Sequence, residues 1–184
     1  MSKIILASGS PRRKELLTMI GIDFDVIVAD IEEKIDYSND LVKEIEKLSF
    51  QKANAVFTNH QDKIVIGSDT IVKLNSTVFG KPKTKQEAKE MLKTLSNKTH
   101  QVVTAVTILS KDKKETFSSI TDVTFYELDD KQIDEYVESV EPLDKAGAYA
   151  IQGKGCEFVK KINGDYYTVV GLPIAEVYRR LQNY

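Results

Sequence analysis

Residues 64–74 have the sequence Ile-Val-Ile-Gly-Ser-Asp-Thr-Ile-Val-Lys-Leu, an apolar run with a polar centre. β-Branched residues dominate both halves, so the run predicts a buried strand that is broken in the middle by Ser68-Asp69-Thr70. A charge in such a run is costly unless it is paired or bound to a metal, which makes Asp69 a candidate functional residue. The alternative is a structural aspartate that caps the following loop. Gly67 permits another part of the molecule to approach the backbone closely.

The rest of the chain alternates strand and helix patterns around this segment. Further strands are predicted at residues 4–7, 24–28, 101–109, 116–125, 158–162 and 166–170, the last two joined by the hairpin signal Asn163-Gly164. Helices are predicted at residues 11–20, 40–57, 133–140, in the segment that starts with the capping box 84–87, and after Pro173. This alternation is typical of the α/β class. Because no repeat or linker divides it, we expect a single domain over residues 1–184.

Composition excludes several classes of protein. Of the 184 residues, 41% are hydrophobic and 29% charged, which is the balance of a globular domain and not of a disordered or collagen-like chain. The net charge of −2 makes a nucleic-acid polymer a poor partner, because such binding depends on a basic surface, but it leaves a small anionic ligand open. The single cysteine, Cys156, excludes an internal disulfide and a Cys-rich zinc site.

The sequence also lacks the usual targeting signals. The apolar run at the N-terminus is too short for a signal peptide, and no stretch approaches the roughly 20 apolar residues of a membrane span. We therefore expect a reduced, soluble, cytoplasmic protein with no membrane partner.

The segment Ser8-Gly9-Ser10-Pro11-Arg12-Arg13-Lys14 has the features of a helix start, yet it places three cations in the first turn. The N-terminus of a helix is its positive end, so these cations are unfavourable there unless an anion binds. Backbone N–H groups, serine hydroxyls and two guanidinium groups would suit a phosphate. The alternative is that the cations are simply solvated.

Two lysines have a similar interpretation. Lys52 lies in the middle of an apolar helical stripe, so either its ammonium group snorkels to the surface or it emerges beside a carboxylate or phosphate. Lys81 lies between Gly80 and Pro82, which favour an extended loop suited to a phosphate contact, although any surface turn has the same pattern.

A divalent cation such as Mg²⁺ needs a few carboxylates, and Asp69 with Glu32 or Glu33 would suffice. Further polar candidates are Asp122, Asp144 and Lys145. The isolated His60 and His100 favour structural roles, and Cys156 has no nearby histidine to activate its thiol. The chain has no P-loop sequence and no Gly-x-Gly-x-x-Gly motif.

Five motifs, in order along the chain, resemble the Maf-type nucleotide pyrophosphatases. They are residues 6–13 (Leu-Ala-Ser-Gly-Ser-Pro-Arg-Arg), 67–70 (Gly-Ser-Asp-Thr), 80–82 (Gly-Lys-Pro), 141–149 (Glu-Pro-Leu-Asp-Lys-Ala-Gly-Ala-Tyr) with 151–153 (Ile-Gln-Gly), and 170–173 (Val-Gly-Leu-Pro). The resemblance implies a mixed, elongated sheet with two lobes around a cleft, similar to the inosine-triphosphate pyrophosphatases. It also implies metal-dependent hydrolysis of a nucleoside triphosphate to the monophosphate and pyrophosphate.

The resemblance further implies a role for each matching residue. Arg12, Thr70 and Gln152 mark the branch that hydrolyses dTTP and UTP, with CTP and modified uridine triphosphates as further candidates. Asp69 would accept a proton from water, Lys52 would stabilise negative charge, and Glu33 and Asp69 would hold Mg²⁺ or Mn²⁺. The phosphates would contact Ser8, Ser10, Arg12, Arg13 and Lys81. A homodimer is suggested by the resemblance alone.

Two residues depart from the family pattern, namely Ala150 in place of a usual glycine and Val140 before Glu141-Pro142. Ala150 lies two residues before Gln152, so this departure could tighten the base pocket. It leaves open which pyrimidine triphosphate the protein prefers. The purpose of the reaction is open as well: it could remove surplus or non-standard nucleotides in a house-cleaning role. The alternative is a nucleotide-binding regulator of cell division, or septum formation, without turnover. A sugar-phosphate enzyme is a more distant candidate.

Overall fold

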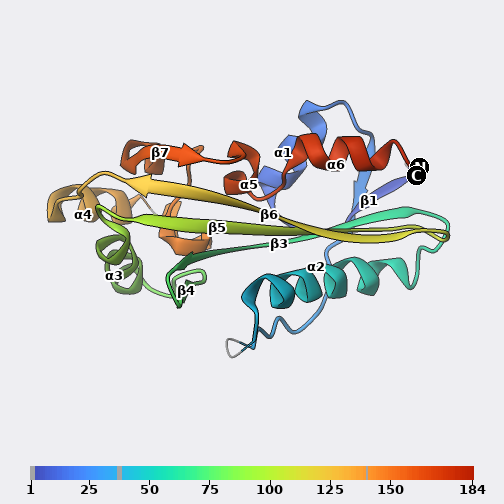
Figure 1. The fold of residues 1–184 in the computed structure, drawn as a ribbon, viewed down its shortest axis with the longest axis horizontal. Helices are drawn as coiled ribbons and strands as arrows, with labels where there is room; N and C mark the ends of the chain where they lie inside the picture. Colours follow the sequence, from blue (N-terminus) through green and yellow to red (C-terminus); the bar gives the residue numbers. More distant parts are fainter. Residues whose placement is uncertain (1–2, 37–38, 140) are drawn as a thin grey trace. The chain divides into compact units, whose positions relative to one another are not determined.

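A computed structural model describes residues 3–36, 39–139 and 141–184 (Figure 1). The strands are β1 (Ile4–Leu6), β2 (Phe24–Val26), β3 (Ile64–Leu74), β4 (Thr77–Phe79), β5 (Thr99–Leu109), β6 (Lys114–Phe125) and β7 (Val159–Asn163). The α-helices are α1 (Pro11–Met19), α2 (Leu41–Phe57), α3 (Lys85–Leu95), α4 (Asp130–Glu138), α5 (Tyr166–Val170) and α6 (Ile174–Leu181). Three short 3-10 helices complete the order: η1 (Glu141–Asp144), η2 (Ala146–Ala148) and η3 (Lys154–Phe158).

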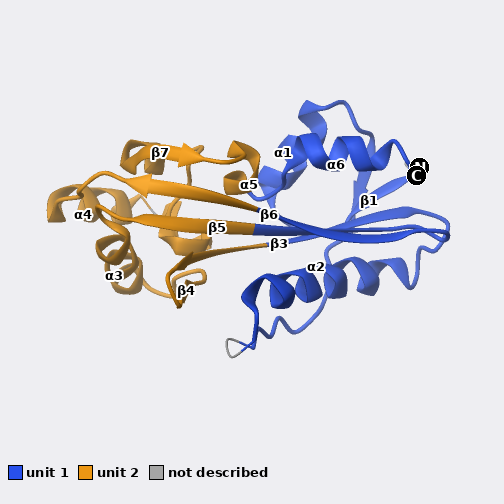
Figure 2. Cartoon of the chain, viewed as in Figure 1, with its two compact units in different colours: residues 1–69, 104–119, 171–184 blue, residues 70–103, 120–170 orange. Residues whose placement is uncertain are grey.

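The chain forms two compact units, coloured separately in Figure 2. Unit 1 comprises Met1–Asp69, Thr104–Ser119 and Gly171–Tyr184, and unit 2 comprises Thr70–Val103 and Ile120–Val170. Three long strands, β3, β5 and β6, therefore contribute residues to both units. The strand order is β2-β1-β3-β5-β6 in unit 1 and β4-β3-β5-β6-β7 in unit 2. Because β1 pairs in parallel with β2 and β3 whereas β4 and β7 pair antiparallel, the sheet is mixed, which confirms the predicted α/β class.

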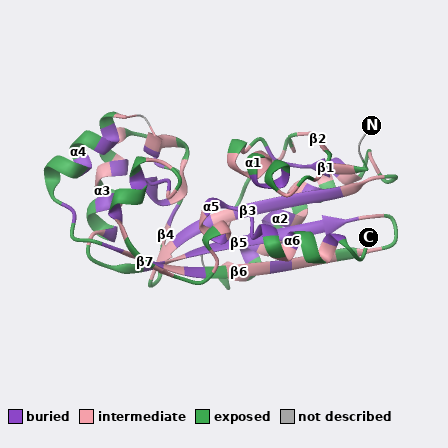
Figure 3. Ribbon diagram, turned by 90° about the horizontal axis from the view of Figure 1, so that it is seen from above, coloured by how far each residue is buried: buried purple, intermediate pink, exposed green. Residues whose placement is uncertain are grey.

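In unit 1, helices cover both faces of the strands. Helix α2 lies on one face, and α1 and α6 lie on the other (Figure 1). Ala53 and Val56 of α2 pack on Ile5 of β1 and Val65 of β3, all of which are buried. Figure 3 shows that β3 and β5 are mostly buried, as expected of strands with covered faces.

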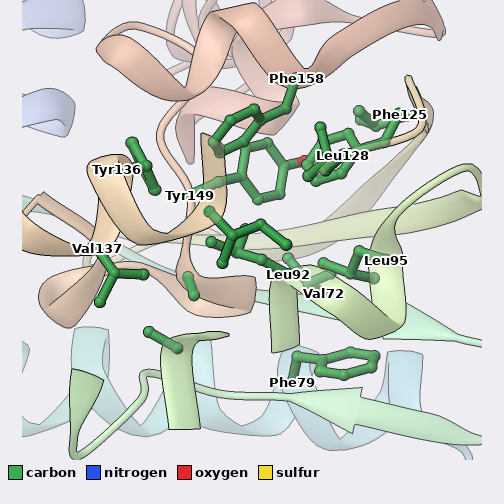
Figure 4. Packing of buried hydrophobic residues seen from close by; sticks show 14 of the residues in the cluster. Val72, Phe79, Leu92, Leu95, Phe125, Leu128, Tyr136, Val137, Tyr149 and Phe158 are labelled. Atoms are coloured by element: carbon green, nitrogen blue, oxygen red, sulfur yellow. The ribbon is translucent and has the colours of Figure 1, made fainter. Parts of the chain in front are cut away.

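The core of unit 2 combines aliphatic side chains with several aromatic ones, among them Phe125 of β6 (Figure 4). The Phe125 ring makes edge contacts with His100 and Tyr149, with centroid distances of 4.8 Å in each case. Phe158 contacts Phe125 at 5.9 Å and Tyr136 at 4.8 Å. Helix α3 packs against α4 and η2 around this core, so the loop after α4 is attached to a rigid support.

The predicted break in residues 64–74 is wrong, because β3 continues through Ser68-Asp69-Thr70. Ser68 and Asp69 are buried, and each side chain has a hydrogen-bond partner. The strand can therefore continue through these polar residues. The Ser68 hydroxyl donates to the carbonyl of Gly171 at 3.2 Å, and the Asp69 carboxylate accepts from the Lys52 ammonium group at 2.6 Å.

The predicted strand at residues 166–170 is also wrong, because these residues form the short helix α5. The Asp165 carboxylate accepts hydrogen bonds from the backbone N–H and the hydroxyl of Thr168, at 2.7 and 2.9 Å, which stabilises a helical turn. Strand β7 pairs with β6 instead, with Ile162 opposite Val123. Gly164 follows β7 with φ 131°, and a side chain there would meet Thr121.

Helix ends agree with the sequence in most places. The Thr84 hydroxyl accepts from the Glu87 N–H at 3.1 Å, as predicted, although the Glu87 carboxylate accepts from Lys83 and not from Thr84. Val140, which was expected to end the helix at 133–140, lies outside the described residues, and α4 ends at Glu138. In the described part of the chain, none of the helices combines the length and apolar character needed to span a membrane.

Acid should destabilise the protein through His100, whose side chain is 1% exposed. Burial lowers the pKa of His100 from 6.5 to about 4. Since the unfolded chain binds the proton more readily, the free energy of unfolding is highest above about pH 6.5 and falls as the pH approaches 4, by about 3 kcal/mol from this residue. Denaturant titrations from pH 7.5 to 4.5 measure this loss. His100→Gln, which cannot titrate, should lose less stability over that range, and parallel curves for the two proteins would contradict the assignment.

Candidate active site

Helix α2 approaches β3 closely at Gly67. A Cβ atom built on Gly67 would lie 2.5 Å from the carbonyl oxygen of Ser49 and 2.7 Å from the amide nitrogen of Ala53, so only glycine fits. On the same helix, the buried Ser49 hydroxyl hydrogen-bonds Thr107 of β5 at 2.8 Å, and Thr107 bonds Thr116 of β6 at 2.8 Å. These contacts fix the position of α2 against the strands. The close approach that the sequence predicts at Gly67 is therefore made by α2.

Lys52, between the residues of α2 that touch Gly67, points its ammonium group at two carboxylates. Its Nζ lies 2.6 Å from Oδ1 of Asp69 and 2.8 Å from Oε1 of Glu33. The side chains of Lys52 and Asp69 are only 12% and 13% exposed, whereas that of Glu33 is 55% exposed. The sequence left open whether the Lys52 ammonium group snorkels to the surface or emerges beside a carboxylate or phosphate. In the structure it lies beside carboxylates.

Removing Lys52 would leave the largely buried Asp69 carboxylate without its ammonium partner, a loss that typically costs about 3–5 kcal/mol, whereas without Asp69 the ammonium group of Lys52 would keep Glu33. The cluster of one ammonium group and two carboxylates offers carboxylate oxygens as ligands for a cation. Of the two glutamates considered from sequence, Glu33 joins this cluster, while Glu32 pairs with Lys34 at 2.9 Å on the surface.

Two carboxylates are a donor set that fits Mg²⁺ or Mn²⁺, which prefer oxygen ligands and take the remainder from water and phosphates. Within residues 3–36, 39–139 and 141–184, no group of three or more His, Cys, Asp or Glu side chains is gathered as a metal site. A metal bound here would therefore have Glu33 and Asp69 as its protein ligands. Water molecules and the phosphates of a ligand would supply the rest of its coordination.

Arg13 joins three segments of unit 1 beside this cluster. Its Nε donates to the carbonyl of Gly171 at 2.8 Å, and its Nη1 donates to the carbonyl of Ser68 at 2.8 Å and to the Ser8 hydroxyl at 3.1 Å. Burial lowers the pKa of Arg13, while the nearby Asp69 raises it. An arginine keeps its charge in proteins, so Arg13 places a fixed positive charge next to Asp69.

The parallel register of β1 and β3 brings Ser8 and Asp69 to nearly the same level along the two strands. Strands β1 and β3 are parallel with Leu6 opposite Ile66, and the residues that follow carry the polar side chains. Ser8 is buried, and its hydroxyl also accepts from the Ser10 N–H at 3.2 Å. Ser8 lies just beyond the carboxyl end of β1, where ligands of open α/β sheets bind, whereas Asp69 lies in the middle of β3, which continues to Leu74.

Helix α1 begins at Pro11 with Ser10 as N-cap, as the sequence predicts, but the Ser10 side chain makes no capping bond. Its first turn holds Arg12 and Arg13 with no acidic residue. The positive end of the helix therefore carries further positive charge, an arrangement that an anion would stabilise.

The other predicted residues belong to unit 2. Thr70 follows Asp69 along β3 and is half-buried, and Lys81 is exposed in the loop after β4. The N–H of Gly147 donates to the carbonyl of Gly80 at 3.1 Å, which attaches that loop to η2. Gln152 is exposed in a turn closed by the Gly153 N–H and the carbonyl of Ala150 at 3.2 Å.

Other polar candidates have local partners. Asp122 accepts from Gln101 at 3.0 Å, Asp144 contacts Lys145, and His100 bonds the Tyr149 hydroxyl at 2.9 Å in the core. Cys156 is exposed. Sequence reasoning missed the contact of Arg13 with Gly171, since no local pattern reports a partner 158 residues away.

Comparison with known protein families matches residues 3–184 to the family described as "Maf-like protein". The chain belongs to this family. A protein of Bacillus anthracis (strain CDC 684 / NRRL 3495) named "dTTP/UTP pyrophosphatase" is 55% identical over 184 residues, covering 100% of this chain and 96% of its own. A protein of Bacillus cereus (strain AH820) with the same name has the same identity and coverage. Among solved structures, that of the Staphylococcus aureus Ham1 protein overlaps 66% of this chain and 71% of its own, with a TM-score of 0.47 and 17% identity.

Gly67→Ala should force α2 away from β3, because the new methyl group would lie within 3 Å of three atoms of α2. Overpacking of this kind costs about 1–3 kcal/mol of the free energy of unfolding, measured by denaturant titration. Gly80→Ala is the matched control, since its Cβ would have no atom within 4 Å, and it should change stability by less than about 0.5 kcal/mol. Equal losses in the two variants would show that α2 does not depend on Gly67.

Proposed function

We propose that this chain is a nucleoside triphosphate pyrophosphatase that hydrolyses dTTP and UTP to the monophosphate and pyrophosphate. The observation that carries the proposal is the Lys52–Asp69–Glu33 cluster, which lies beside Arg13, while Arg13 also bonds Ser8 just beyond the carboxyl end of β1. Membership of the Maf-like family and the printed names of the 55% identical relatives support the same reaction. CTP and modified uridine triphosphates are further candidate substrates.

The Asp69 carboxylate orients the attacking water and accepts its proton as the bond between the α- and β-phosphorus atoms breaks. Lys52 stabilises the negative charge that develops, and its bond to Asp69 holds that carboxylate in one position. Both groups are supported from α2 and β3, which are regular and buried elements, so little reorganisation is needed during the reaction.

The phosphates are bound by Ser8, Ser10, Arg12, Arg13 and Lys81. Arg13 acts from a fixed position, because its guanidinium group already bonds Gly171, Ser68 and Ser8. Arg12 and the N–H groups at the start of α1 supply further positive charge, which is the arrangement that anions favour at a helix N-terminus.

Glu33 and Asp69 hold a divalent cation, Mg²⁺ or Mn²⁺. The cation supplies neutralisation of charge on the phosphate oxygens when it is bound. Support comes from the oxygen donors of the two carboxylates.

Arg12, Thr70 and Gln152 select the base. These side chains hydrogen-bond the pyrimidine base. A different base that left their polar groups unpaired would bind more weakly. Ala150, where the family usually has glycine, is buried, and its N–H donates to the Tyr136 hydroxyl at 3.1 Å.

Residues 1–184 act as one Maf-type domain, since the family match runs from residue 3 to residue 184 without interruption. We further propose that the protein works in the cytoplasm on free nucleotides and that it assembles as a homodimer, a suggestion of the family resemblance that gel filtration with light scattering tests directly.

Asp69→Asn should lower pyrophosphate release from UTP and dTTP by at least 10²–10³-fold, because it removes the proton acceptor and the closer of the two carboxylates that pair with Lys52. The assay is pyrophosphate release from a panel of pyrimidine and purine triphosphates with Mg²⁺ or Mn²⁺. Asp122→Asn is the matched control and should retain most of the activity. Asp122 lies on another strand, β6, and its carboxylate accepts a hydrogen bond from the neutral side chain of Gln101.

Binding measurements separate the enzyme from a regulator that does not turn its nucleotide over. A folded wild-type protein that binds UTP but releases no pyrophosphate from any triphosphate would favour the regulator. A protein that neither binds nor hydrolyses any triphosphate would favour an enzyme that acts on another phosphate compound, such as a sugar phosphate.

Removal of divalent metal by EDTA should abolish pyrophosphate release, and added Mg²⁺ or Mn²⁺ should restore it. Glu33→Gln keeps the size of the side chain but removes one of the two carboxylates, so the Mg²⁺ concentration for half-maximal activity should rise about tenfold or more. Glu32→Gln provides the matched control, because Glu32 pairs with Lys34 on the surface. Activity that persists in EDTA would contradict the metal dependence.

A further inference from the structure

The carboxylate of Glu141, the first residue of η1, is surrounded by the turn that carries Gln152. Its Oε2 accepts from the backbone N–H of Lys154 at 3.2 Å, and its Oε1 accepts from the N–H of Gly155 at 3.4 Å. These are the first N–H groups of η3, which a carboxylate stabilises by hydrogen bonds. The residues that follow Gln152 are therefore held by Glu141.

Tyr136 of α4 holds the residues that precede Gln152. Its hydroxyl accepts from the N–H of Ala150 at 3.1 Å and donates to Oε1 of Glu141 at 2.9 Å. Burial raises the pKa of Tyr136, and the Glu141 carboxylate raises it further, so the phenol remains a donor. A single chain of hydrogen bonds thus runs from Ala150 through Tyr136 and Glu141 to the N–H groups of Lys154 and Gly155, and Gln152 lies between its two ends in sequence.

Two glycines make this arrangement sterically possible. A Cβ atom on Gly153 would lie 2.3 Å from Oε1 of Glu141, and one on Gly155 would lie 2.8 Å from the carbonyl oxygen of Ala150 and 3.0 Å from the Tyr136 hydroxyl. The carboxylate and the phenol therefore occupy the space that side chains at residues 153 and 155 would need. The turn is folded around these two polar groups and contacts them on both sides of Gln152.

We propose that Glu141, together with Tyr136, is a positioning residue that fixes Gln152 for recognition of the pyrimidine base. The proposal rests on the proposed function, in which Gln152 contacts the base. Glu141 and Tyr136 themselves touch neither substrate nor reacting atoms: their effect on the reaction passes through the backbone of residues 150–155. Loss of either group loosens the turn and weakens binding of the nucleotide without changing the groups that act on the phosphates.

The main test is Tyr136→Phe, which removes one hydroxyl group and keeps the ring in the aromatic core. With UTP as substrate, KM should rise about three- to tenfold, as expected when a displaced Gln152 loses about one hydrogen bond to the base, while kcat stays within about twofold. Glu141→Gln, which replaces one acceptor oxygen by an amide group facing the Lys154 N–H, should have the same effect. Gly153→Ala, which alters no polar group but displaces the carboxylate, should also raise KM.

A double-mutant cycle shows whether the effect passes through Gln152. In the Gln152→Ala background, Tyr136→Phe should change KM by less than about 1.5-fold, because the group that it positions is already absent. Tyr149→Phe is the matched control: it removes a buried phenol oxygen of the same core, one that bonds His100, and should lower the melting temperature but leave KM unchanged.

The outcomes are distinct. An unchanged KM in folded Tyr136→Phe and Glu141→Gln, or effects that multiply independently with Gln152→Ala, would overturn the positioning role while leaving the reaction in place. So would Gln152→Ala with wild-type KM. If Tyr136→Phe does not fold, Glu141→Gln and Gly153→Ala provide the same comparison. A wild-type protein that turns over no triphosphate contradicts the proposed function and this inference with it.

Discussion

The charged groups of unit 1 depend on the close approach of helix α2 to Gly67 of β3. Because glycine has no side chain, the helix backbone rests directly on the strand, and Lys52 reaches Asp69 only two residues beyond the contact. The hydroxyl bonds of Ser49 and Thr107 hold the same helix against β5. An ammonium group and a carboxylate can then be largely buried together, since each compensates the other. A larger residue at position 67 would separate Lys52 from Asp69 and break this ion pair.

Much of the fold followed from periodicity and helix-end signals. The apolar stripe of α2 and the capping residue of α3 were predicted where the structure has them. The failures have physical causes that no local pattern reports. Asp69 remained in a strand because its partner comes from α2, and residues 166–170, despite their β-branched and aromatic side chains, became a helix because Asp165 caps the turn.

The candidate site was predictable where a residue contradicted its surroundings. Asp69 in an apolar strand, Lys52 in an apolar stripe and three cations at a helix start each indicated a partner that the local sequence lacked. The roles assigned to Glu33, Thr70 and Gln152 came instead from family resemblance and remain proposals. Contacts between distant segments, such as Arg13 with Gly171, could not be predicted, since the sequence around Arg13 does not report which distant carbonyl group it bonds.

The discontinuity of unit 1 has a consequence for the order in which the chain becomes structured during synthesis. All of unit 2 lies within residues 70–170, whereas unit 1 also requires the segment Gly171–Tyr184. Arg13 and Ser68 leave the ribosome early, but the carbonyl of Gly171 that bonds both of them comes more than a hundred residues later. A growing chain therefore carries Lys52 and Asp69 long before their surroundings are complete. Helix α6, which follows Gly171, is the last described helix to be made, so partly synthesised chains lack the bonds of Arg13 and Ser68 to Gly171.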